Sequence, residues 1–258
     1  MPYTIPNDWE RAAERLGVLG AAYDAASRAA ARQLGLRGGW ECLEAGAGGG
    51  SFARWLCAQV LPGGRVLAVD LDPRHLHDLR EHGGEVAKLD LVTDALPGQR
   101  FDFVHARLVL LHIAARERVL DKLVRALKPG GAILVEEHDA FGVIEEMSGA
   151  YGRVWPLFRR VGERGGLDAT WARRLPQHLE RRGLEEVAAA AEIPFFRGGS
   201  PLARLWQLTW LQNRPELLQL GATEELLDAA TGELADAGNW FYCPPMIRAT
   251  GRRPAAES

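Results

Sequence analysis

Four residues in the first fifth of the chain have the types and spacing needed to bind a small polar ligand. Glu44 ends an apolar run, and Gly46, Gly48 and Gly50 follow at alternate positions. Glycine tolerates positive φ and allows a ligand to approach the backbone closely. A helical pattern begins directly afterwards, so the loop leads into a helix N-terminus, which favours negative charge. The stretch therefore predicts a strand–loop–helix that holds a small polar molecule.

Apolar runs and helical patterns alternate on the C-terminal side of this loop. After the strand that begins at Trp40, we predict further strands at residues 65–70, 85–89, 101–106 and 132–137, with helices between most of them. Asp72-Pro73 is typical of a helix start, and the sequence KPGG at 128–131 predicts a helix end before the fifth strand. Strands that alternate with helices indicate right-handed crossovers and a parallel sheet covered on both faces.

The flanking segments are predicted to be largely helical. Residues 8–36 have the pattern of one or two amphipathic helices, which Gly17 and Gly20 would interrupt. Later in the chain we predict a helix at 148–164, a helix from Asp168 to Gly183, a strand at 185–192, and helices capped by Ser200 and Thr223. A final strand from about 242 to 251 contains Pro244-Pro245, which favours an edge position.

Residues 44–50 resemble the E/D-x-G-x-G-x-G loop of the class I S-adenosylmethionine-dependent methyltransferases. Asp70 ends the second strand, Asp90 ends the third, and the LKPGG turn precedes the fifth, as in that family. The resemblance covers residues 20–140, and HARLVLLH and LKPGGAILVEEHD look most like a group of bacterial small-molecule methyltransferases. It implies a Rossmann-like α/β fold with a mostly parallel seven-stranded sheet between helices, S-adenosylmethionine as cofactor and S-adenosylhomocysteine as product.

The resemblance also implies roles for single residues. Asp70 would accept hydrogen bonds from both ribose hydroxyls, and Asp90 would accept one from the adenine amine. The glycines would border the amino-acid end of the cofactor. The full set expected to bind the cofactor is Glu44, Gly46, Ala47, Gly48, Gly50, Asp70, Leu71, Asp90, Leu91, Ala106 and Arg107.

A dinucleotide is the competing ligand, because residues 48–53 match G-x-G-x-x-A and Asp70 lies where a ribose-binding acid is expected. That reading gives a nicotinamide-dependent oxidoreductase. Glu44 before the glycines, Asp90 and the LKPGG turn favour the methyl donor. A third hypothesis is a protein that binds S-adenosylmethionine without transferring its methyl group.

The chemistry on the acceptor side is predicted from single residues. His112 follows the fourth strand and is the candidate general base, because an ordinary histidine pKa of about 6.5 suits proton removal at neutral pH. A histidine that caps the next helix is the alternative. His105 is a core histidine or a site residue, and Arg107 is a cofactor contact or a structural ion pair. The expected acceptor pocket contains Glu137, His138, Trp155 and Trp206.

Composition limits the partners. The net charge is −3, and no basic, aromatic-interleaved face predicts nucleic-acid binding. The three cysteines form no C-x-x-C pair, so neither a metal site nor a disulfide framework is predicted, and a reducing cytoplasm fits best. No apolar run reaches the roughly 18 residues of a membrane span, so no membrane association is expected.

We expect residues 1–258 to form a single methyltransferase domain. Residues 1–36 would be a helical N-terminal cover, 37–140 the cofactor-binding core, and 141–258 the rest of the sheet with a helical insertion at about 200–238. The aromatic-rich insertions favour a small aromatic or polyketide-like acceptor, methylated on oxygen, nitrogen or carbon, over a polymer. The assembly state is open, a homodimer included.

Overall fold

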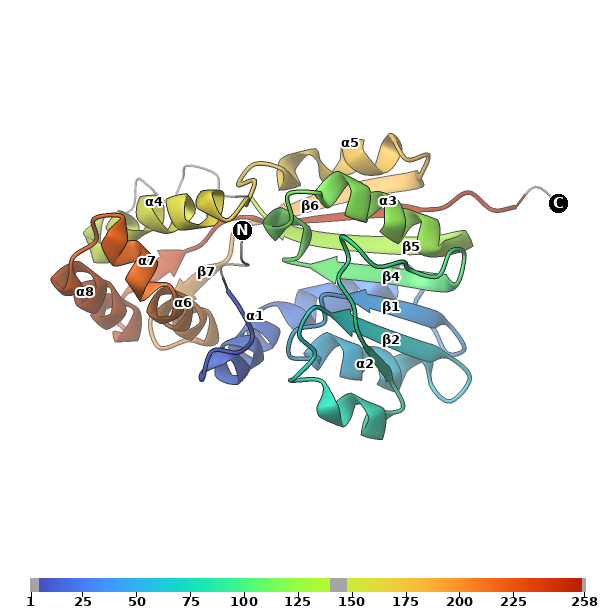
Figure 1. Ribbon diagram of the computed structural model, residues 1–258, viewed down its shortest axis with the longest axis horizontal. Helices are drawn as coiled ribbons and strands as arrows, with labels where there is room; N and C mark the ends of the chain where they lie inside the picture. Colours follow the sequence, from blue (N-terminus) through green and yellow to red (C-terminus); the bar gives the residue numbers. More distant parts are fainter. Residues whose placement is uncertain (1–4, 140–147, 257–258) are drawn as a thin grey trace.

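A seven-stranded sheet forms the centre of the protein in the computed structural model, which describes residues 5–139 and 148–256 (Figure 1). In spatial order the strands are β3 (Glu85–Lys88), β2 (Arg65–Asp70), β1 (Glu41–Ala45), β4 (Phe101–Arg107), β5 (Leu127–His138), β9 (Met246–Arg252) and β6 (Glu185–Glu192). The first five pair in parallel, and β9 runs antiparallel to both β5 and β6. The predicted α/β fold with a mostly parallel seven-stranded sheet is confirmed.

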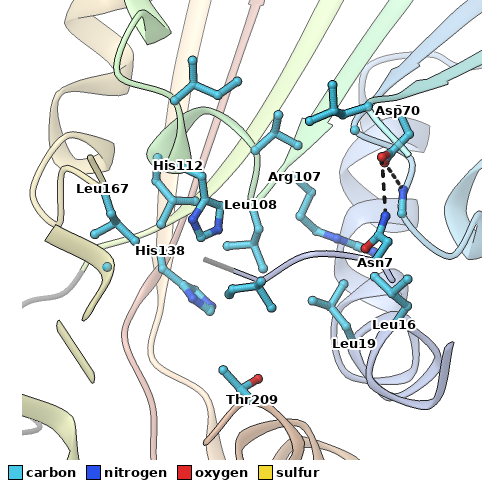
Figure 2. A pocket seen from close by; sticks show the side chains of 18 of the residues that line it. Asn7, Leu16, Leu19, Asp70, Arg107, Leu108, His112, His138, Leu167 and Thr209 are labelled. Carbon is cyan, nitrogen blue, oxygen red and sulfur yellow. Dashed lines mark hydrogen bonds between the residues drawn. The ribbon is translucent and has the colours of Figure 1, made fainter. Parts of the chain in front are cut away.

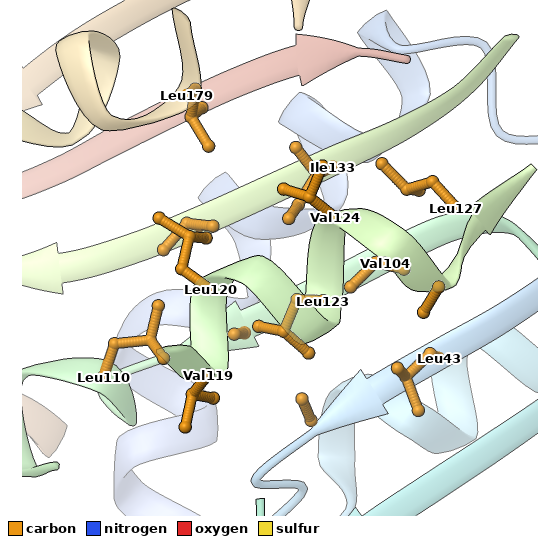
Figure 3. Packing of buried hydrophobic residues seen from close by; sticks show 14 of the residues in the cluster. Leu43, Val104, Leu110, Val119, Leu120, Leu123, Val124, Leu127, Ile133 and Leu179 are labelled. Carbon is orange, nitrogen blue, oxygen red and sulfur yellow. The ribbon is translucent and has the colours of Figure 1, made fainter. Parts of the chain in front are cut away.

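Apolar side chains on successive strand residues point to opposite faces of the sheet and build two cores. Leu43, Val104 and Ile133 face a core that α3 (Arg116–Ala126) and α5 (Leu175–Glu180) cover (Figure 3). Residues next to them in the chain, such as Cys42 and Leu134, face a second core. That core is covered by α2 (Ser51–Val60) and the C-terminal part of α1 (Ala12–Gln33). Both faces of the central strands β1, β4 and β5 are thus buried, as a parallel sheet requires.

A third, aromatic-rich core lies among helices at one end of the sheet (Figure 1). The helices around it are α4 (Gly149–Arg164), α6 (Pro201–Gln212), α7 (Arg214–Gln219) and α8 (Glu224–Ala235). A two-stranded sheet of β7 (Phe195–Arg197) and β8 (Trp240–Tyr242) packs with them. The predicted caps are present: the Ser200 hydroxyl accepts from the Ala203 N–H, and the Thr223 hydroxyl accepts from the Leu226 N–H.

Several expected elements differ in the structure. Helix α1 is continuous through Gly17 and Gly20, and Gly20 packs so closely on Ser51 that a Cβ there would lie 2.5 Å from the Ser51 hydroxyl. The expected helix after Asp72-Pro73 is only the short 3-10 helix η1 (His77–His82). The segment after Asp168 forms a 3-10 turn, η4 (Ala172–Arg174), followed by the short helix α5.

The last strand was expected at an edge, and this expectation is wrong. β9 lies inside the sheet between β5 and β6. Pro244 and Pro245 precede its first residue, Met246, so neither proline removes an N–H from the ladder. Similarly, α3 ends at Ala126, and residues 128–131 belong to the start of β5 instead of forming the helix terminus.

Candidate functional site

A cavity of about 500 Å³ lies at the carboxyl ends of β1, β2, β4 and β5. Its wall comes from the glycine loop after β1, the ends of β2 and β4, and helices α1, α4 and α6. The volume lies within the range of small-molecule and cofactor sites, about 300–1,000 Å³. Open α/β sheets bind ligands at this edge, so the cavity is the candidate site.

The glycine loop is shaped by its backbone. Gly46, Gly48 and Gly50 have φ values of +70°, +52° and +75°, which favour glycine over any other residue. The Gly46 and Ala47 N–H groups donate to the Val69 carbonyl at 2.8 and 3.1 Å, which ties the loop to β2. A Cβ on Gly46 would lie 2.3 Å from Val109 Cγ2, so the loop and the turn after β4 approach each other only because residue 46 has no side chain.

Asp70 joins the end of β2 to this loop. One carboxylate oxygen accepts from the Gly48 N–H at 2.8 Å, and the other accepts from the Asp72 N–H at 2.9 Å. The Asn7 amide, from the segment before α1, lies 3.5 Å from the same carboxylate (Figure 2). Burial raises the pKa of Asp70, and the two backbone donors oppose that shift. The carboxylate is therefore preorganised and faces the cavity.

Asp90, Leu71 and Leu91 form the part of the wall beyond β2 and β3. One Asp90 carboxylate oxygen accepts from the Val92 N–H at 2.7 Å. Leu71 is 56% exposed, an unusual fraction for a large apolar side chain, and its exposed surface borders the cavity. An aromatic ring could pack on it, with the Asp90 carboxylate available to an amine.

A row of buried charges crosses four neighbouring strands below the cavity; we call it the charge ladder. His105 Nδ1 lies 2.7 Å from the Glu44 carboxylate, and His105 Nε2 lies 2.9 Å from that of Glu136. Arg248 on β9 donates to the second Glu136 oxygen. Burial alone lowers the pKa of His105, but the two carboxylates outweigh it and raise this pKa to about 9. Glu44 thus both lines the cavity and binds a protonated His105.

Arg107 connects the charge ladder to helix α1. Its guanidinium donates to the Asp24 carboxylate and to the Ser27 hydroxyl, each at 2.8 Å. The Ser27 hydroxyl in turn donates to Glu136. Arg107 also borders the cavity, so the ion pair and the position at the site, which sequence reasoning treated as alternatives, coexist. His105 is fully buried and is not among the lining residues, so it is a core histidine.

Two histidines face the part of the cavity that lies away from the glycine loop. The His112 and His138 rings point into the space between Leu108, Leu167 and Thr209 (Figure 2). Burial lowers the pKa of His112 to about 4, with Arg15 and Arg116 adding to the effect. Burial and the neighbouring His112 lower the pKa of His138 to about 3. Both imidazoles are therefore neutral at pH 7. Trp155, Phe158 and Trp206 complete this apolar side.

The segment that carries most of the site matches a known protein family. Residues 43–135 match the methyltransferase domain family, and this segment runs from the end of β1 through the glycine loop, Asp70 and Asp90 to β5. Residues 43–135 are therefore a methyltransferase domain, of the class I S-adenosylmethionine-dependent kind. The family's methyl donor is S-adenosylmethionine.

Individual relatives of this methyltransferase match only in part. Methyltransferase str2 of Strobilurus tenacellus is 29% identical over 157 residues, which cover 59% of this chain and 56% of str2. The ubiquinone/menaquinone biosynthesis C-methyltransferase UbiE of Cronobacter sakazakii is 28% identical over 165 residues, 60% of this chain and 65% of UbiE. The chain thus spans between about half and two-thirds of the length of these curated relatives.

Solved structures share the fold of the methyltransferase at low identity. Phosphoethanolamine N-methyltransferase 2 of Haemonchus contortus, solved with phosphomonomethylethanolamine and S-adenosylhomocysteine, superposes with a TM-score of 0.65 and 14% identity over 98% of this chain and 60% of that chain. YcgJ of Bacillus subtilis gives a TM-score of 0.62 and 15% identity over 91% of this chain and 100% of that chain.

Most of the site residues predicted from the sequence of this methyltransferase lie at the one cavity, but three do not. Gly50 caps α2, and Ala106 points into the core below α3. Glu137 lies one position before His138 on β5 and faces the opposite side of the sheet. Burial raises the pKa of Glu137 to about 8, and one oxygen of its carboxyl group accepts from the Val109 and Leu110 N–H groups at 3.1 and 2.7 Å. Glu137 thus holds the turn after β4 and does not line the acceptor pocket.

Sequence reasoning missed the part of the wall that comes from the N-terminal region. Asn7, Arg15, Leu16 and Leu19 all line the cavity of the methyltransferase. Leu16 and Leu19 lie within residues 8–36, for which the sequence predicts only amphipathic helices. Phe158, one helical turn from Trp155 on α4, could have been included by its i,i+3 spacing. Asn7 carried no sequence signal.

Within the described residues, no group of three or more His, Cys, Asp or Glu side chains is arranged to hold a metal ion. Cys42, Cys57 and Cys243 are buried and free. No helix in the described part of the methyltransferase combines the length and apolar character that crossing a bilayer needs.

Proposed function

We propose that this protein transfers a methyl group from S-adenosylmethionine to a small-molecule acceptor. The observation that carries the proposal is one cavity with two unlike halves. The cofactor half has the glycine loop, Asp70 and Asp90, and the acceptor half has neutral histidines and tryptophans. The names of the relatives str2 and UbiE support methyl transfer. We infer that residues 1–258 act as one domain, with α1, α4 and α6 covering the site.

The residues present fit the cofactor. A Cβ on Gly46 would lie 2.3 Å from Val109 Cγ2, so only glycine lets the loop pack against the turn after β4 beside the cavity. The Asp70 carboxylate is held by two backbone donors in a position to accept ribose hydroxyls, and Leu71 and Asp90 offer an apolar surface and an acceptor to the base. When bound, S-adenosylmethionine supplies an electrophilic methyl group.

The protein's own contribution is orientation and exclusion of water. Trp155, Phe158 and Trp206 would enclose the acceptor body, and an enclosed, aligned acceptor reacts faster than one in bulk solvent. We propose that His112 accepts a hydrogen bond from the reacting group. Because its pKa is about 4, complete proton transfer to it from a hydroxyl is uphill, so its help is to polarise the acceptor.

We infer an acceptor of small-molecule size, an aromatic or polyketide-like metabolite methylated on oxygen, nitrogen or carbon. The acceptor half is one part of a cavity of about 500 Å³, too little space for a folded macromolecule. Its apolar and aromatic wall favours a flat, apolar acceptor body.

Calorimetry with S-adenosylmethionine and S-adenosylhomocysteine tests the first half of the proposal. Saturable binding at one site is expected, and no binding by a folded sample contradicts it. Incubation with labelled S-adenosylmethionine and a panel of aromatic acceptors tests the second half through labelled product.

Methyl transfer needs its own measurement, because the fold is shared with proteins of other activity. One solved neighbour, the [4+2]-cyclase SpnF, superposes with a TM-score of 0.52 and 18% identity over 90% of this chain and 81% of that chain. Binding of the cofactor without labelled product across the panel would favour a non-transferring role.

A further inference from the structure

The two halves of the cavity differ in charge, and the difference bears on the acceptor of the proposed reaction. Among the lining residues that the structure describes, the carboxylates are Glu44, Asp70 and Asp90, and all three belong to the cofactor half. The acceptor half has arginines, neutral imidazoles and apolar rings. Burying an ammonium without a carboxylate partner is costly, and the arginines of this half repel it, so this half suits an uncharged or anionic acceptor better than an amine cation.

His138 is held rigidly in this half. Its Nε2 atom lies 3.0 Å from the Tyr23 hydroxyl of α1, and its ring stacks on Trp206 at a centroid distance of 6.0 Å. Tyr23 is 5% exposed, lies outside the cavity wall and also approaches Cys243 Sγ at 3.7 Å. Tyr23 therefore fixes the ring of His138 without touching a ligand.

The hydrogen-bond pattern sets the role of the second ring nitrogen. Burial raises the pKa of Tyr23 well above its ordinary value, so the hydroxyl keeps its proton. An imidazole nitrogen is a better acceptor than a thiol sulfur, so Tyr23 donates to Nε2 and the proton of the neutral ring resides on Nδ1. The structure gives Nδ1 no hydrogen bond within the described residues, and Nδ1 is not one of the buried side-chain atoms that lack a partner, so it is open to the cavity.

We propose that the acceptor is an uncharged or anionic aromatic oxygen compound, that the His138 Nδ1–H donates a hydrogen bond to its oxygen, and that Tyr23 is the positioning residue that fixes this donor. The inference rests on the proposed function. The acceptor proposed for this protein differs in chemical class from phosphomonomethylethanolamine, the amine bound in the Haemonchus contortus structure, although the two proteins share the fold.

Three probes of one shape test the proposal: 1-naphthol, naphthalene and 1-naphthylmethylamine, which is a cation at neutral pH. Their affinities for the protein saturated with S-adenosylhomocysteine are measured by ligand-observed NMR. We expect 1-naphthol to bind about fivefold more tightly than naphthalene, the effect of roughly one neutral hydrogen bond, and the cation to bind most weakly. Tighter binding of the cation overturns the proposal.

Variants assign the effect to residues. His138→Phe keeps an aromatic ring on Trp206 and should lower the naphthol-to-naphthalene ratio; His112, which accepts from the hydroxyl, accounts for any preference that remains. Tyr23→Phe should lower the ratio partly and should remove the Nδ1–H signature of His138 from long-range ¹H–¹⁵N spectra. Tyr151→Phe is the matched control, because Tyr151 is also buried and its hydroxyl donates to the Tyr242 carbonyl instead. Its ratio should equal that of the wild type.

The outcomes separate the two proposals. An unchanged ratio in His138→Phe, or an unchanged tautomer in Tyr23→Phe, refutes the inference while the cofactor binding of the same samples stands. Calorimetry with S-adenosylhomocysteine should give wild-type affinity in both variants, which also reports that they are folded. Absence of that binding in the wild type would contradict the proposed function itself.

Discussion

Replacing Asp70 by asparagine should damage both the loop and cofactor binding, although the two side chains have nearly the same shape. Both Asp70 oxygens accept from backbone N–H groups, of Gly48 at 2.8 Å and of Asp72 at 2.9 Å. An amide has one acceptor oxygen, so its NH₂ must face one of these donors. A hydrogen bond to a charged group contributes about 1.5–3 kcal/mol, and Asp70 is partly solvated, so we expect a loss of about 1.5 kcal/mol in unfolding free energy.

The same change should reduce cofactor affinity. A neutral amide that can no longer accept both ribose hydroxyls loses about 1.5–3 kcal/mol of binding, or about 10- to 100-fold in Kd. Urea unfolding gives the stability of Asp70→Asn, and calorimetry with S-adenosylhomocysteine gives its affinity.

Asp90→Asn is the matched comparison. Asp90 accepts the Val92 N–H through one oxygen only, and an amide oxygen can replace it. This variant should keep wild-type stability and lose affinity, because its NH₂ would face the adenine amine. If Asp70→Asn binds S-adenosylhomocysteine as tightly as the wild type does, the assignment of Asp70 to the ribose is wrong. If it is also as stable, the two backbone hydrogen bonds do not hold the loop.

Three further predictions follow from the site. Gly46→Ala should be less stable and bind the cofactor more weakly than Gly183→Ala in urea unfolding and calorimetry. Both glycines have φ near +70°, but only at Gly46 would a Cβ meet a neighbour, Val109 at 2.3 Å. Unfolding free energy measured against pH should be greatest near pH 6.5. Above it the contribution of His105 is lost as the pH approaches about 9, because its folded pKa is raised. Below pH 6.5 the histidine at position 138 takes up a proton in the unfolded chain, but in the folded protein it stays neutral down to about pH 3. The unfolding free energy therefore falls as the pH falls, and His138→Phe should make this fall less steep. His112→Ala should lower turnover of a hydroxyl acceptor about tenfold or more with little change in cofactor Kd, and full turnover would remove His112 from the mechanism.

The fold and the cofactor half were predictable because their signals are local. Glycines at alternate positions, a carboxylate at the end of an apolar run, and capping residues such as Ser200 and Thr223 each act within a few residues of the chain. The position of β9 was not predictable in this way. Pro244 and Pro245 suggested an edge strand, yet the chain uses them before the strand begins, where they remove no ladder hydrogen bond.

Which residues face the acceptor half of the cavity could not be predicted from their spacing in the sequence. The C-terminal end of β5 has three consecutive polar residues, Glu136, Glu137 and His138, and the strand is buried on both faces. The sequence therefore shows no alternation of polar and apolar residues that would tell which of the three faces which side of the sheet. In the structure, Glu136 and His138 face α1, and Glu137 faces the turn after β4. The contact of His105 with Glu44 and Glu136 likewise depends on the lateral order of strands.

Helix α1 both binds the charge ladder and forms part of the cavity wall. Its middle is anchored by buried groups, with Asp24 bound to Arg107 and Ser27 bound to the charge ladder, while Leu16 and Leu19, one to two turns earlier, form cavity wall. A buried charge network tolerates no missing partner, because each unpaired charge costs several kcal/mol. The position of α1 on the sheet is therefore fixed by ions of which Asp24, His105 and Glu136 lie outside the cavity wall. The shape of the acceptor half depends on the charge ladder as much as on the aromatic residues that line it.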